Sequence, residues 1–109
     1  MNCPKCETAP LEAGLGAGGM ELDRCGACGG VWLDKGELGA YIPDMSRFDA
    51  ALTEALKTSR SDGRKCPRCA KELRAVIMSK ALTEINICGD CSGLWLDKDE
   101  FAALKKAFG

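Results

Sequence analysis

The chain has 109 residues, a formal net charge of −1, eight cysteines and no histidine. No apolar run approaches the roughly 20 residues of a membrane-spanning helix, and none follows the first methionine, so we expect neither a membrane helix nor a secretory signal peptide. We therefore expect a cytoplasmic protein whose cysteines stay reduced. Because histidine, an isolated nucleophilic cysteine and an assembled acid–base pair are all missing, the sequence predicts that the protein is not an enzyme.

The eight cysteines form an internal repeat. Each copy has the spacing Cys-x2-Cys-x18-Cys-x2-Cys, and the second set follows the first by 63 positions. The sets are Cys3, Cys6, Cys25 and Cys28 in the first copy, and Cys66, Cys69, Cys88 and Cys91 in the second. In a reduced chain such repeated pairs favour a metal over disulfides, because thiolates are good ligands for zinc. We predict two zinc ions per chain, each held within one copy and independently of the other.

The repeat divides the chain into three segments. Residues 1–46 and 64–109 form one unit each, and residues 47–63 have no counterpart. A unit of this size buries too little apolar surface to fold alone, so each needs its metal. We predict a small metal-stabilised α+β protein made of two tandem four-cysteine zinc ribbons. Each ribbon is expected to be a β-hairpin with two knuckles followed by a helix, and a helical linker with a hinge joins the two.

In each unit the first knuckle is expected to lead into a hairpin. The turn Cys3-Pro-Lys-Cys6 brings two sulfurs to one side, and strands are predicted over 7–13 and 20–24 in the first unit and over 72–78 and 82–87 in the second. Aligning Leu11 with Leu73 requires one extra residue in the first strand of the first unit and one fewer after it. The glycine run at 14–19 predicts a flexible hairpin tip and not a phosphate loop, because it leads into a strand.

The residues after the second knuckle repeat most closely. Gly30 and Gly93 are expected to take positive φ angles, so that backbone N–H groups face the thiolates. The apolar residues Val31, Leu33, Leu94 and Leu96 are expected to pack beneath the metal sites. Between them lie Trp32 and Trp95, which either cover the metal site of their own unit or form an exposed platform for a partner. Their apolar neighbours favour burial.

Three helices are predicted. The sequences Asp34-Lys-Gly-Glu37 and Asp97-Lys-Asp-Glu100 have the form of a capping box, which predicts a short helix ending before Pro43 and a longer one with Phe101, Leu104 and Phe108 on one face. A capping signal at Ser46 and the apolar stripe Phe48, Leu52, Ala55 and Leu56 predict a helix over 46–57. Such a stripe is more often a packing face than a ligand site, and self-association through it is the alternative. Residues 58–63 are predicted to be the hinge.

These residues carry a resemblance to a known family. The pattern Cys-Pro-x-Cys, a hairpin and Cys-x-x-Cys-x-Gly-x-Trp-Leu-Asp-x-Gly-Glu-Leu resembles the transcription-factor-IIB-type zinc finger family of small bacterial proteins, which are zinc ribbons. The first unit matches the tail with Gly30, Trp32, Leu33, Asp34, Gly36, Glu37 and Leu38, and the second departs from it at Asp99 and Phe101. The resemblance implies zinc bound by the four cysteines of each unit, but it implies little about a partner.

Other readings of the cysteines are weaker. Iron in a rubredoxin-like site also takes four thiolates, but the second knuckles Cys25-Gly-Ala-Cys28 and Cys88-Gly-Asp-Cys91 lack the proline expected there. A thioredoxin-type dithiol needs a Cys-x-x-Cys that opens a helix, whereas these pairs flank a hairpin.

Charge bears on the choice of partner. Residues 1–63 hold six basic and ten acidic side chains, and residues 64–109 hold nine and six. Four thiolates around a divalent ion leave −2 at each site, so the loaded protein carries about −5. We expect a non-enzymatic protein-interaction module of the adapter kind. The alternative is a nucleic-acid-binding ribbon in transcription that uses Arg68, Lys71 and Arg74 of the basic second unit.

Overall fold

The computed structural model describes residues 2–7, 9–15, 21–34, 37–42, 44–78 and 83–108. Its elements are β1 (Leu11–Leu15), β2 (Glu21–Cys25), β3 (Val31–Leu33), the 3-10 helix η2 (Leu38–Ala40), α1 (Met45–Leu56), β4 (Arg60–Lys65), β5 (Glu72–Met78), β6 (Thr83–Ile87), β7 (Leu94–Leu96) and α2 (Lys98–Phe108). The predicted hairpin tips fall largely outside the described residues, as do Ser79, Lys80 and Leu82. No helix in the described ranges is long and apolar enough to cross a membrane.

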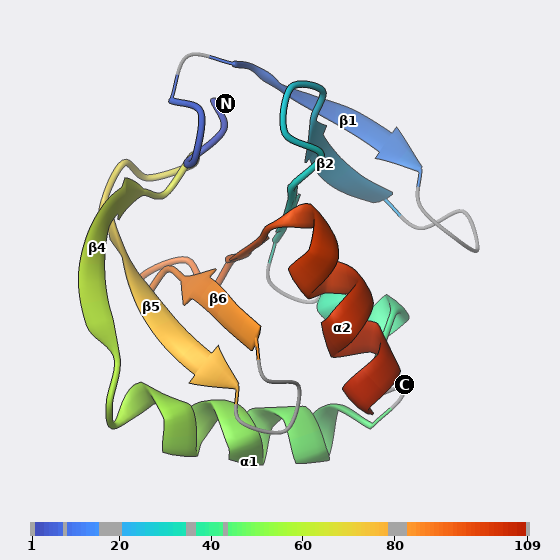
Figure 1. Ribbon diagram of the computed structural model, residues 1–109, viewed down its shortest axis with the longest axis vertical. Helices are drawn as coiled ribbons and strands as arrows, with labels where there is room; N and C mark the ends of the chain where they lie inside the picture. Colours follow the sequence, from blue (N-terminus) through green and yellow to red (C-terminus); the bar gives the residue numbers. More distant parts are fainter. Residues whose placement is uncertain are drawn as a thin grey trace.

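The two units share a single antiparallel sheet. Its strand order is β1-β2-β3-β7-β6-β5-β4, so the halves meet where β3 pairs with β7. Figure 1 shows β1 and β2 on one side of α2 and the strands β4 to β6 on the other. The prediction of two tandem ribbons in an α+β fold is confirmed, and the structure adds that the ribbons are fused edge to edge.

The junction between the halves has internal twofold symmetry. Trp32 pairs with Trp95, which is its own counterpart in the repeat. On either side Val31 pairs with Leu96, and Leu33 pairs with Leu94. A pseudo-twofold axis therefore passes between the tryptophans and relates one ribbon to the other.

The two faces of the sheet bury different clusters. Val31, Leu33, Leu94 and Leu96 face a core that both helices cover, with Phe48 from α1 and Leu104 from α2. The tryptophans face the other side, together with the buried cysteines. Because successive strand residues point to opposite faces, the neighbours of the tryptophans cannot lie beneath the metal sites. That expectation was wrong.

Helix α1 closes the core over the second half of the sheet. It begins at Met45, and the side chain of Asp44 caps it by accepting from the backbone N–H of Arg47 at 3.2 Å, so the cap is not at Ser46. Phe48 is fully buried, whereas Leu56 at the far end is 39% exposed. The apolar stripe is thus a packing face within this chain. Figure 1 shows α1 along one end of β5 and β6.

The segment predicted as a hinge forms an edge strand. Arg60–Lys65 is β4, which pairs with β5 from Arg60 opposite Ala75 to Lys65 opposite Glu72. The register shifts between Ser61 and Lys65, where Gly63 has a φ of +84°. Local sequence favoured a loop, but the unpaired edge of β5 supplies hydrogen-bond partners that make the segment extended.

Candidate metal centres

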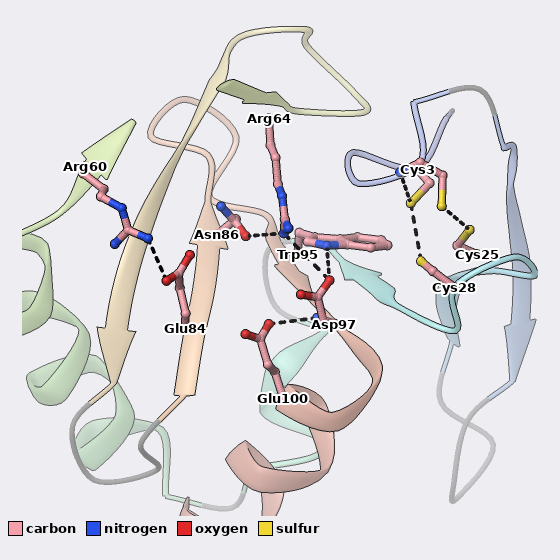
Figure 2. Close-up of polar contacts among 11 residues, drawn as sticks. Cys3, Cys25, Cys28, Arg60, Arg64, Glu84, Asn86, Trp95, Asp97 and Glu100 are labelled. Carbon is pink, nitrogen blue, oxygen red and sulfur yellow. Dashed lines mark hydrogen bonds and ion pairs between the residues drawn. The ribbon is translucent and has the colours of Figure 1, made fainter. Parts of the chain in front are cut away.

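Each set of four cysteines converges on one point. The four sulfurs of each set lie within 4.8 Å of one another. Individual pairs are 3.7 Å apart for Cys3 and Cys28, 3.9 Å for Cys6 and Cys25, 3.5 Å for Cys66 and Cys91 and 3.4 Å for Cys69 and Cys88. Zinc–sulfur bonds of 2.3 Å in a tetrahedron place the sulfurs about 3.8 Å apart, whereas a disulfide places them at about 2.05 Å. The free thiols therefore fit a tetrahedral metal site. Figure 2 shows the sulfurs of Cys3, Cys25 and Cys28 of the first set turned toward one another.

All four knuckles use the same backbone turn. The residue after the second cysteine of each knuckle donates its N–H to the carbonyl of the first cysteine, at 2.8 to 3.0 Å. These residues are Glu7, Gly29, Ala70 and Ser92, and all four have positive φ, between 62° and 77°. The left-handed position thus precedes Gly30 and Gly93, and the prediction that those two glycines take positive φ was wrong.

The knuckles also locate the extra residue of the first unit. The N–H of Cys3 bonds to the carbonyl of Ala9, whereas the equivalent N–H of Cys66 bonds to Lys71, one residue earlier in the repeat. Leu11 then pairs with Cys25 at the start of β1. The insertion therefore lies before β1, which itself starts in register with the second unit.

Gly30 and Gly93 are required by a contact between the units. A Cβ placed on Gly30 would lie 2.4 Å from Cζ2 of Trp95, and one on Gly93 would lie 2.1 Å from Cζ2 of Trp32. Both distances are far shorter than a carbon–carbon contact of about 3.5 Å. Each indole therefore lies on the backbone that follows the second knuckle of the opposite ribbon.

The tryptophans are a buried link between the metal sites. Trp32 and Trp95 have no exposed surface, and they pack in one cluster with cysteines of both sets. The prediction that they are buried agrees with this, and each ring also lies against the backbone of the other unit. An exposed platform for a partner is excluded for both, because the paired strands and the facing glycines enclose the rings.

An aspartate and a glutamate fix each indole. Trp95 Nε1 donates to Asp97 at 3.1 Å, and the backbone N–H of Asp97 donates to Glu100 at 3.0 Å (Figure 2). The first unit repeats this with Trp32 to Asp34 at 2.8 Å and Asp34 to Glu37 at 2.6 Å. The glutamate half of each predicted capping box is therefore present. Both aspartate carboxylates accept from the indoles, and that of Asp34 also accepts from Arg68, which the sequence did not predict.

An ion pair also crosses between the units. The guanidinium of Arg68 binds both carboxylate oxygens of Asp34 through Nε and Nη2. This contact holds the pKa of Asp34 below its usual value, against an opposing effect of burial. In the second unit Asp97 instead lies 3.7 Å from Arg64, which also donates to Asn86 at 3.1 Å (Figure 2).

The other basic residues predicted to contact a partner have partners within the chain. Lys71 forms an ion pair with Asp90. Arg74 donates from Nη2 to the backbone carbonyl of Ser59 at 2.8 Å and to its hydroxyl at 3.1 Å. Arg68, Lys71 and Arg74 are therefore each bound to another group of this chain.

The thiols of each set differ in their pKa. Burial raises the pKa of Cys3 and of Cys66 to about 12. Burial also acts to raise the pKa of Cys25, but the backbone N–H groups of Cys28 and Ala27 stabilise its thiolate and bring the pKa down to about 7. Cys88 is likewise brought to about 7. Metal binding must therefore displace protons from the most buried thiols, which makes it depend on pH.

Comparison with known proteins gives one match. A family model described as a transcription factor zinc-finger, of the transcription-factor-IIB zinc-ribbon type, matches residues 2–43 and 65–107. Neither the curated proteins nor the solved structures contain a match. The two matched regions each hold one complete set of cysteines.

Proposed function

The chain belongs to the transcription-factor-IIB-type zinc-ribbon family, in two tandem copies, and we propose that it is a non-enzymatic module that binds a protein partner and is held together by two structural zinc ions. The observation that carries the proposal is the fusion of two four-thiolate sites into one sheet around buried tryptophans. In such a scaffold the cysteine thiolates and the buried tryptophans stabilise the fold itself.

The donor set supports closed zinc sites. Four cysteine thiolates occupy all the positions of a tetrahedral ion, whereas a catalytic zinc keeps one position for water. Two sulfurs of each set belong to buried residues, namely Cys3 and Cys25 in the first unit and Cys66 and Cys88 in the second. The bound ion would supply folding energy. A reducing compartment such as the cytoplasm suits these free thiols.

Charge supports a protein partner over a nucleic acid. Three basic side chains of the second unit are paired with carboxylates of this chain, namely Arg64 with Asp97, Arg68 with Asp34 and Lys71 with Asp90. A phosphate backbone would have to displace these carboxylates. It would also approach a loaded protein of about −5 net charge, which opposes association.

Titration with fluorescent single- and double-stranded oligonucleotides at about 50 and 200 mM salt tests the choice of partner. We expect weak binding or none at either concentration. Tight binding that falls steeply with salt and is lost when Lys71 and Arg74 are changed to Glu would overturn the proposal in favour of a nucleic-acid ribbon. Lys57→Glu is the matched control, because Lys57 lies at the end of α1 and pairs only with the nearby Glu54 among the described residues.

A further inference from the structure

We propose that a pocket between α2 and the first half of the sheet binds an acidic segment of the protein partner, anchored by one apolar side chain. This inference rests on the protein-binding function proposed above and adds a site and a ligand chemistry to it. The pocket has a volume of about 350 Å³, at the small end of the roughly 300–1,000 Å³ range of ligand sites. Its walls come from β2, β3 and α2, together with the chain segment that follows η2.

The floor of the pocket is apolar. The buried core residues Leu22, Val31 and Phe101 line the pocket, together with the partly buried Tyr41. The ring of Tyr41 meets that of Phe101 edge to face, with centroids 5.2 Å apart. A floor of aliphatic and aromatic side chains with a fixed geometry favours an inserted apolar side chain.

The rim of the pocket is basic. Arg24 stands on the β2 side, and Lys98 and Lys105 stand two turns apart on the same face of α2. The stem of Lys98 passes over Gly29, where a Cβ would lie 3.1 Å from its Cδ. The Nζ of Lys105 lies 4.4 Å from the centroid of the Phe101 ring. The three cations thus surround the apolar floor.

These cations differ from Arg64, Arg68 and Lys71, which pair with carboxylates of this chain. Among the side chains that the structure describes, no ion pair involves Arg24, Lys98 or Lys105. None of the described residues that line the pocket is acidic. A ligand with carboxylates would therefore meet three cations without displacing any group of this chain.

The internal symmetry provides a comparison. The pocket related by the pseudo-twofold axis has Ile87, Ser92, Leu94 and Leu38 in place of Arg24, Gly29, Val31 and Phe101, and a volume of about 260 Å³. Among the described residues that line it, the charged ones are Asp34 and Asp49. The fold therefore makes an apolar hollow in both halves, and the described charged side chains are basic around one and acidic around the other.

The shape and charge favour an acidic peptide over a nucleic acid. A phosphate backbone carries many negative charges, and the protein, whose net charge is negative, would repel it over a long stretch. A short acidic segment brings only a few carboxylates, and these lie at the basic rim. The apolar floor then contributes burial energy that a sugar–phosphate chain cannot use. An acidic residue on each side of a leucine or an aromatic residue fits this arrangement.

The test is an array of acidic heptapeptides whose central residue runs through the aliphatic and aromatic amino acids, probed with the zinc-loaded full chain. Peptides that bind are then titrated against labelled protein, with amide chemical shifts followed by NMR. We expect the largest shifts at Val31, Tyr41 and Phe101, and a loss of affinity when the acidic residues of the peptide become neutral. Lys105→Glu should weaken binding by at least about tenfold, as expected for removing and reversing a rim charge.

Lys106→Glu is the matched control, because Lys106 is the next residue of α2, is exposed and does not line the pocket. It should leave affinity within about twofold of the unchanged protein. The inference is overturned if no peptide in the array binds, if both lysine variants lose affinity equally, or if an oligonucleotide displaces the peptide and binds more tightly. In the first two cases two bound zinc ions and an absence of oligonucleotide binding leave the proposed function standing, whereas the third outcome removes both.

Discussion

Trp32 and Trp95 lie opposite each other on β3 and β7, and each indole packs against the glycine that follows the second knuckle of the other's ribbon. This reciprocal contact joins the two metal sites through one buried cluster. The ribbons are therefore parts of one folding unit, and changes in one are expected to be felt in the other.

Gly93→Ala tests the contact directly. The added methyl group would lie 2.1 Å from the Trp32 ring, so the indole or β7 must move. We expect a loss of about 1–3 kcal/mol in the free energy of unfolding of the zinc-loaded protein, as for other overpacked cores, measured by denaturant titration. Gly89→Ala is the control, because a Cβ there meets nothing within 4 Å. An equal effect of both substitutions would show that the glycine–indole contact is not what matters.

Cys88→Ser tests the coupling between the sites. Independent units were expected from the sequence, with the first unit keeping its zinc. The shared cluster instead predicts that the first site loses affinity by roughly 5- to 150-fold, the usual range for coupled sites, measured by competition with a chromophoric chelator. Cys25→Ser should weaken the second site by the same factor, because coupling is reciprocal. Unchanged affinity of the remaining site in either variant would show that the ribbons fold separately.

Removal of metal should unfold the chain. Structural zinc in small domains contributes about 10–16 kcal/mol of apparent binding free energy, which exceeds the net stability of a domain of this size. We expect elemental analysis to return two zinc ions per chain, and circular dichroism to lose its strand and helix signal after chelation. Protein from metal-replete cells that carries iron, or that keeps its native spectrum without metal, would contradict this.

Arg68→Gln should weaken the junction between the units. Its bidentate ion pair with Asp34 spans the two ribbons but is partly exposed, so we expect a loss of about 0.5–1 kcal/mol. Lys71→Gln is the control, because its ion pair with Asp90 lies within one unit and is more exposed, and it should change stability little. A double-mutant cycle of Arg68→Gln with Asp34→Asn measures the coupling energy of the pair. A coupling energy of zero would show that the ion pair does not stabilise the protein.

The pH dependence of this contribution follows from the carboxyl group. Arg68 lowers the pKa of Asp34 in the folded protein. A lowered carboxyl pKa stabilises the fold above the ordinary value of about 3.9, and the stabilisation is lost as the pH falls through the lowered pKa. The difference between the Arg68→Gln variant and the unchanged protein should therefore be constant between about pH 6 and 8. A difference that varies across this range would point to another group.

The pKa shift of Glu100 has the opposite sign to that of Asp34, and it destabilises the fold at neutral pH. Burial raises its pKa, so its charged form is disfavoured in the folded protein. The penalty is absent below the ordinary pKa of about 4.3, grows as the pH rises towards the raised value, and is constant above it. Glu100→Gln keeps an acceptor for the N–H of Asp97 without the charge, so we expect a melting temperature at pH 8 equal to or above that of the unchanged protein. Glu100→Ala, which removes the acceptor, should cost about 1–2 kcal/mol. Equal destabilisation by both would show that the charge is needed.

The sequence predicted what short-range patterns and repetition determine. The cysteine spacing defined both metal sites, and the Asp-x-x-Glu pattern predicted the start of α2 and the bond from the backbone of Asp97 to Glu100. These features depend on residues a few positions apart, or on a ligand set that one ion gathers. Burial of the tryptophans followed from their apolar neighbours.

The fusion of the ribbons could not be predicted in the same way. Pairing of β3 with β7 joins residues about 63 positions apart. Strands of three residues are too short for their hydrophobic pattern to predict which strand they pair with. The requirement for Gly30 and Gly93 arises only from that pairing. From the sequence alone, a positive φ angle was the expected reason for each glycine. Residues 60–65 became a strand because the edge of β5 was available, although their own sequence resembles a loop.

The pairing of β3 with β7 has the form of a contact between identical subunits. Val31 meets Leu96 and Leu33 meets Leu94, so the same surface of each ribbon is used twice about one axis, as in an isologous dimer. A chain with one ribbon presents the complete surface and can build this junction only by meeting a second molecule. Tethering both copies through α1 and β4 replaces that bimolecular encounter with an effective concentration set by the tether, so the junction forms at any dilution.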